Sequence, residues 1–112
     1  MRYMMFVATD LDPDRSGDEG IDIEDWVAEN DGRGVRVLGE RLRPPADATL
    51  VRVRNGEVLI TDGPFTESKE WIAGFDILEC DDLDQAIEVA SRHPMARGGR
   101  IELRPFHPVD ED

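Results

Sequence analysis

The sequence has little cysteine and no long hydrophobic run. Cys80 is the single cysteine among 112 residues, so no disulfide can form within the chain, as is usual in a reducing compartment. No apolar stretch approaches the roughly 20 residues of a membrane-spanning helix, and the N-terminus lacks the apolar segment and cleavage site of a signal peptide. We therefore expect a cytoplasmic protein without a membrane partner.

Positive charge is also scarce, with 13 basic residues against 26 acidic ones and a formal net charge of −13. Binding of nucleic-acid phosphates needs clustered positive charge, which argues against DNA or RNA as a direct partner. The exception is an arginine-rich segment over residues 33–54, where six arginines stand against two acids. This segment predicts either ion pairs with acids elsewhere in the sheet or in a second subunit, or a site for an anionic ligand.

The hydrophobic pattern predicts six short strands and two helices. The strand-length runs cover residues 2–8, 35–43, 49–54, 57–61, 71–78 and 100–105. Asn55-Gly56 predicts a tight hairpin between the third and fourth runs, and Gly39 is a position where a bulge could switch the strand's phase. Helical spacing predicts a first helix that begins after Asp22 as its cap and whose stripe contains Ile23, Trp26, Val27 and Asn30. It predicts a second helix that begins at the capping pair Asp82 and Gln85 and whose stripe contains Leu83, Ala86, Ile87 and Ala90.

Without the hairpin, the element order is βαββαβ, which is the ferredoxin-like plan of two helices on one face of an antiparallel sheet. The predicted class is therefore α+β, with one domain over residues 1–107 and an acidic tail over 108–112. Two helices cannot cover the second face of the sheet, so we expect a homodimer whose sheets pack face to face.

Residues 62–70 read Asp-Gly-Pro-Phe-Thr-Glu-Ser-Lys-Glu and continue to Ala73-Gly74-Phe75. This stretch resembles the signature of the DGPF branch of the YCII-related family, and the resemblance covers most of residues 1–8 and 35–106. It implies a dimeric α/β barrel, an association with extracytoplasmic-function sigma factors, and, from the wider family, an enzymatic His/Asp pair. The residues around His93 do not match closely enough to assign it to that pair. Between residues 9 and 34 an acidic loop replaces part of the family's longer first helix, which predicts a more open cleft.

The signature itself has two interpretations. In one, Asp62-Gly63 is a turn in which glycine supplies a positive φ, and Phe65 anchors the loop in the core. In the other, the loop binds a ligand, with Asp62 as base or acceptor and Lys69 as its electrostatic partner.

His93 likewise has two interpretations, because it stands at a predicted helix end before Pro94. It is either a packed or capping histidine, or a general acid/base that faces a carboxylate. We expect no metal and no cofactor, because one cysteine and two distant histidines fit no usual zinc spacing and the acidic loop from Asp10 lacks the glycine and glutamate of a calcium loop.

The sequence thus leaves two functional hypotheses. The first is a small-molecule site near the signature loop, in which Asp62 and His93 perform acid/base chemistry and Lys69, Phe65, Arg52 and Arg54 bind a small, anionic ligand. The second is a non-catalytic regulatory module linked to an extracytoplasmic-function sigma factor.

Overall fold

The structure is a computed structural model that describes residues 1–18, 20–63 and 71–108. Its elements, in chain order, are β1 (Arg2–Thr9), α1 (Ile23–Gly32), β2 (Arg36–Arg41), a 3-10 turn (Pro45–Asp47), β3 (Thr49–Arg54), β4 (Glu57–Asp62), β5 (Ile72–Glu79), α2 (Leu83–Arg92), α3 (Met95–Gly98) and β6 (Gly99–Pro105).

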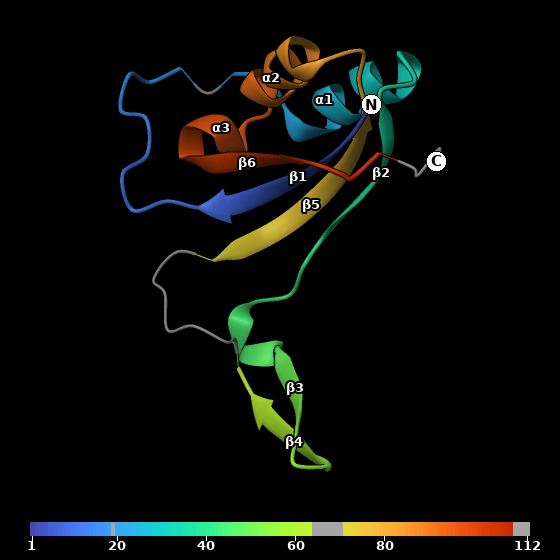
Figure 1. The fold of residues 1–112 in the computed structure, drawn as a ribbon. Helices are drawn as coiled ribbons and strands as arrows, with labels where there is room; N and C mark the ends of the chain where they lie inside the picture. The colour runs from blue at the N-terminus through green and yellow to red at the C-terminus, as the bar shows by residue number, and fades with distance from the viewer. Residues whose placement is uncertain (19, 64–70, 109–112) are drawn as a thin grey trace.

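Four strands form one sheet in the order β2-β5-β1-β6, with every neighbouring pair antiparallel. This is the ferredoxin-like order, so the predicted α+β class and βαββαβ plan are confirmed, as is the central position of β5. The three helices lie on one face of this sheet (Figure 1). Strands β3 and β4 form a separate two-stranded sheet that extends away from the rest of the chain.

Alternation along the strands separates a buried face from an open one. Tyr3 and Met5 of β1 are buried, Leu78 of β5 lies opposite Tyr3, and their side chains join Trp26 of α1 in the core. The intervening Met4, Phe6, Ala8, Phe75 and Ile77 are only partly buried and point to the face without helices. The apolar face that the sequence analysis left uncovered is therefore present in the structure.

The inserted hairpin has the predicted geometry. Asn55 and Gly56 have φ values of 52° and 80°, the left-handed conformation that a two-residue hairpin turn requires. Cross-strand pairs Val51–Ile60 and Val53–Val58 share one face, and all four side chains are 57–66% exposed. We call these four residues the hairpin apolar face.

The second helix differs from its predicted orientation. Asp82 caps it as expected, because its carboxylate accepts a hydrogen bond from Gln85 N at 2.9 Å. Its buried residues, however, are Ala86, Val89 and Ala90, whereas Leu83 and Ile87 are each 50% exposed. The buried face of α2 is therefore rotated by part of a turn from the predicted stripe. The cause is that α1 packs on the side of α2 that carries Val89, where Trp26 Nε1 donates to Val89 O at 2.9 Å.

Two smaller predictions were also wrong. Asp22 stands at the start of α1 but its side chain makes no capping hydrogen bond. The irregularity in β2 falls between Arg36 and Leu38, and not at Gly39, which pairs regularly with Asp76. Of the described helices, none combines the length and hydrophobicity needed to cross a membrane.

Candidate functional site

A cavity of about 590 Å³ is bounded by the sheet and the helical layer. Its apolar lining residues are Val7, Ile23, Trp26, Val27, Pro94 and Met95, together with Ala73 and Phe75 of β5, whose side chains alternate to the open face of the sheet. Its charged and polar side chains include Arg36, Arg41, Asp76 and His93. A volume in this range with a mostly apolar wall and a few polar groups is typical of a site for a small molecule.

Two glycines leave room in the strands that border the cavity. Gly39 of β2 pairs with Asp76 of β5, and a Cβ atom on Gly39 would overlap the Asp76 carboxylate. Gly74 pairs with Arg41, and a Cβ atom there would lie 2.9 Å from the carbonyl oxygen of Glu40. The space occupied by the Asp76 carboxylate therefore depends on the missing side chain at Gly39.

The Asp76 carboxylate is paired with Arg36, whose Nε donates to Oδ1 at 2.8 Å. Arg36 is held at its other nitrogens, because Nη1 donates to Asp31 Oδ1 at 3.2 Å and Nη2 to Gly39 O at 3.1 Å. Burial raises the pKa of Asp76, although Arg36 opposes the shift. Partial burial lowers the pKa of Arg36. Its hydrogen bonds to Asp76 and Asp31 outweigh this effect, so the pKa of Arg36 is raised overall.

His93 lies where α2 ends and α3 begins, with 4% of the residue exposed. Its ring stands edge-on to Trp26, with 4.7 Å between ring centroids and 71° between planes. Met95 N donates to His93 Nδ1 at 2.9 Å, and burial lowers the pKa of the imidazole to about 4. His93 is therefore uncharged at neutral pH, contrary to the cationic helix-end histidine that its sequence position favours.

Arg41 contributes the second guanidinium of the cavity. Its side chain is exposed, and it makes no hydrogen bond or ion pair with any residue in the described ranges. It stands in contrast to Arg36, which is fully engaged by Asp76, Asp31 and Gly39. Arg41 is thus available to an anionic group at the cavity.

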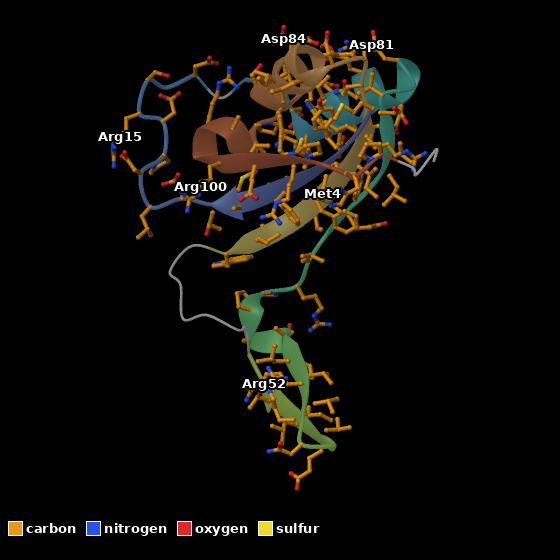
Figure 2. The ribbon with its side chains drawn as sticks, in the orientation of Figure 1. Met4, Arg15, Arg52, Asp81, Asp84 and Arg100 are labelled. Carbon is orange, nitrogen blue, oxygen red and sulfur yellow. The ribbon has the colours of Figure 1, made fainter. Side chains whose placement is uncertain are left out.

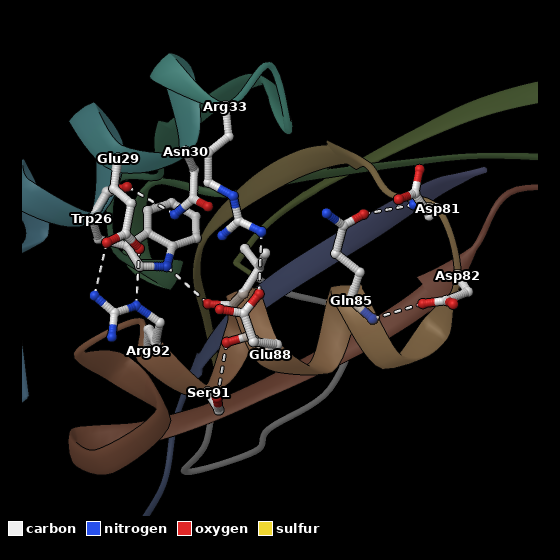
Figure 3. A network of polar contacts seen from close by, with 11 residues as sticks. Trp26, Glu29, Asn30, Arg33, Asp81, Asp82, Gln85, Glu88, Ser91 and Arg92 are labelled. Carbon is white, nitrogen blue, oxygen red and sulfur yellow. Dashed lines mark hydrogen bonds and ion pairs between the residues drawn. The ribbon is translucent and has the colours of Figure 1, made fainter.

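Contacts between α1 and α2 fix the helical wall of the cavity (Figure 3). Arg92 donates through Nε and Nη2 to the two carboxylate oxygens of Glu29 at 2.9 and 2.8 Å, and Arg33 lies 3.3 Å from Glu88. Together with the hydrogen bond from Trp26 to Val89, these pairs hold Trp26 beside His93.

The structure separates the residues that the sequence grouped together. His93 lines the cavity, whereas Asp62, Arg52 and Arg54 lie on the hairpin strands and none of these three lines it. Figure 2 shows Arg52 on the hairpin, apart from the helices. Gly63 has the positive φ expected for a turn, at 94°, and donates from its backbone N–H to Ala48 O at 2.7 Å.

Phe65 and Lys69, the other two candidate residues, lie outside the described residues. No group of three or more metal-ligating side chains occurs within residues 1–18, 20–63 and 71–108.

Sequence reasoning did not single out Arg36 and Arg41 within the arginine-rich segment, and it missed Asp76. The available signals were the arginine-rich segment and the single charge in the apolar run of residues 71–78. The ion-pair interpretation of that segment is confirmed for Arg36, which pairs across strands with Asp76. Arg36, Arg41 and Asp76 line one cavity because of the register in which β2 pairs with β5, and the sequence did not specify that register.

Comparisons with known proteins identify the family of the chain. The sequence profile of the YCII-related domain matches residues 1–110. An uncharacterized protein, R00369, from Rhizobium meliloti (strain 1021) is 39% identical over 68 residues, which cover 59% of this chain and 55% of that protein. The chain thus matches little more than half the length of this curated relative. Assignment to the DGPF branch stays a prediction from the signature, but the match over residues 1–110 shows that the chain belongs to the YCII-related domain family.

Proposed function

We propose that the chain binds a small organic acid in the cavity between the sheet and the helices. The observation that carries the proposal is an apolar cavity of about 590 Å³ that also holds Arg41, an arginine without a hydrogen bond or ion pair to any residue that the structure describes. The apolar part of the ligand would contact Trp26 and Val27, and its carboxylate would face Arg41. Arginine suits this role because its planar guanidinium can bind a carboxylate through two hydrogen bonds.

The balance of charge in the cavity supports an anion. Arg41 and Asp76 lie on the same face because Arg41 pairs with Gly74, two residues from Asp76 on β5. The irregularity between Arg36 and Leu38 brings Arg36, which pairs with Leu78, to that face as well. Arg36 offsets the charge of Asp76. Glu40 also lines the cavity, but it pairs with Phe75 and alternation directs its side chain to the opposite face, which leaves Arg41 uncompensated among the described residues of this face. Asp76 is also the best candidate for proton transfer, since a buried carboxyl with a raised pKa can exchange a proton closer to neutral pH.

Thermal-shift screening against small carboxylic acids and their primary amides tests this proposal. Acids that bind should raise the melting temperature more than the amides do, and the rise should disappear in Arg41→Ala. Arg52→Ala is the matched control, because it removes the same charge from the hairpin. A wild-type response to acids that survives Arg41→Ala but is lost in Arg52→Ala would transfer the site to the hairpin and contradict the proposal.

We also propose that a second copy covers the open sheet face, which gives the dimeric α/β barrel implied by the family resemblance. The support is the row of partly buried apolar side chains Met4, Phe6, Phe75 and Ile77, which is more apolar than a sheet face in water normally is. Light scattering at micromolar concentration should give twice the chain mass of 12.6 kDa. Ile77→Glu should give the monomer, and a monomeric wild type would refute the proposal.

A second candidate function is a regulatory module that binds a protein such as an extracytoplasmic-function sigma factor. The hairpin apolar face favours it, because exposed apolar side chains that cluster on one surface mark contact sites. Binding to such a purified sigma factor should be lost in Ile60→Lys and kept in Glu57→Lys, whose side chain lies at the hairpin tip. Equal binding by both variants would exclude the hairpin apolar face as the contact.

A further inference from the structure

The two ring nitrogens of His93 have different surroundings. Met95 N donates to Nδ1 at 2.9 Å, so Nδ1 must carry a lone pair and cannot carry a proton. In an uncharged imidazole the single proton is then on Nε2. Nε2 has no hydrogen-bond partner in the part of the chain that the structure describes, although the ring lines the cavity.

We propose that His93 donates a hydrogen bond from Nε2 to an acceptor oxygen of the bound molecule, of the carbonyl or carboxylate type. The inference rests on the proposed function, and deepens it by naming the group on the ligand that His93 recognises. His93 is then a specificity-determining donor. The sequence also allowed a general acid/base role for His93, but Asp76 is the better candidate for accepting a proton.

The surroundings of the ring oppose its protonation. A proton on Nδ1 would face the N–H of Met95 and break the hydrogen bond that fixes the ring. The charged residues that line the cavity on the sheet side are Arg36, Glu40 and Arg41 of β2 and Asp76 of β5, and Asp76 is already bound to Arg36. The residues that α1 and β1 contribute to the cavity, Ile23, Trp26, Val27 and Val7, carry no charge.

A fixed donor makes the site selective. A ligand oxygen opposite Nε2 gains a hydrogen bond, whereas an ammonium or amide N–H group in the same place would leave two donors facing each other. Sites that are built around a particular hydrogen bond reject analogues that lack its partner. His93 should therefore discriminate between oxygen acceptors and nitrogen donors attached to the same apolar group.

The test uses ¹⁵N-labelled full-length protein and two-bond ¹H–¹⁵N correlation spectra of the histidine rings. His93 should show an unprotonated Nδ1 and a protonated Nε2, and this pattern should persist from about pH 8 to about pH 5, where an ordinary histidine is charged. The exposed His107 is the internal control, because the chain has two histidines. A proton on Nδ1, or protonation of the His93 ring above about pH 5, would overturn the inference whether or not a ligand binds.

Benzoate and benzylamine are the probes in the second part of the experiment. Benzoate should shift the backbone amide signals of Trp26 and Ala73 and the Nε2 signals of His93, and benzylamine should bind at least about tenfold more weakly. His93→Phe retains a ring beside Trp26 and should remove the part of that discrimination that Arg41 does not supply.

The outcomes separate the two proposals. If benzoate shifts the cavity amides but leaves Nε2 unchanged, the organic-acid site stands and the donor role is overturned. If benzoate shifts no cavity amide, the organic-acid site is contradicted, and the ligand role of His93 fails with it.

Discussion

Acidification should destabilise the folded chain through His93. Burial lowers the pKa of this imidazole from 6.5 to about 4 in the folded state, whereas the unfolded chain exposes the ring to water. Above pH 6.5 both states are uncharged at this position, so His93 gives stability no pH dependence there. As the pH falls below 6.5, the unfolded state takes up the proton first, and the free energy of unfolding decreases.

The size of the effect follows from the two pKa values. A difference of about 2.5 between the pKa values corresponds to a loss of about 2 kcal/mol at pH 5 and about 3 kcal/mol at pH 4. No large reduction for solvent screening applies, since the residue is 4% exposed. A loss of this size is a substantial part of the stability of a small domain.

Urea unfolding at fixed protein concentration, repeated from about pH 8 to about pH 4, measures this loss. Carboxylates titrate in the same range, so the informative quantity is the difference between wild type and His93→Gln, which lacks the titrating ring. His107→Gln provides the matched control because it makes the same substitution at an exposed position. Its pH profile should follow that of wild type.

Parallel pH profiles for wild type and His93→Gln would refute this reasoning. They would mean that the ring gains a proton equally well in the folded and unfolded states. Water would then reach Nδ1 in place of the Met95 N–H group, and the fixed tautomer of His93 would also be lost.

Three further substitutions give separate tests. Gly39→Ala should displace the Asp76 carboxylate, which lowers the melting temperature and abolishes stabilisation by benzoate, as thermal shift would show. Arg36→Met should destabilise the fold by about 3 kcal/mol in urea unfolding, because Asp76 is left unpaired, and adding Asp76→Leu should recover most of this loss. Asp82→Ala should cost about 1 kcal/mol through loss of the cap on α2, while Asp84→Ala should change stability by less than about 0.5 kcal/mol. Equal losses in the last two variants would contradict the capping assignment.

The parts of the fold that were predictable depend on local signals. Asn55-Gly56 specifies its hairpin because few residue pairs tolerate two successive positive φ values. The buried side of α2 depends on a distant contact. Apolar spacing fits both a face that includes Leu83 and Ile87 and one that includes Val89, and the docking of Trp26 on Val89 O selects the second.

The site was less predictable than the fold because it depends on strand register. Arg36 and Asp76 are 40 residues apart, and they meet because β2 pairs with β5 after an irregularity between Arg36 and Leu38. A register change of one residue would move one partner to the other face of the sheet. The sequence marked Gly39 as special, but it did not show that Gly39 makes room for a carboxylate.

The hairpin apolar face lies on β3 and β4, which follow β2 and precede β5 of the cavity along the chain. The hairpin is inserted between β2, which carries Arg36 and Arg41, and β5, which carries Asp76, and Leu42 N extends the pairing of these strands by donating to Ala73 O at 2.8 Å. We expect a partner that binds the hairpin to act through these connections on the strands that set the separation of Arg41 and Asp76. Because such coupling is reciprocal, benzoate should alter partner affinity by the factor by which the partner alters benzoate affinity. Independent binding of the two would show that the hairpin moves without disturbing the β2–β5 pairing.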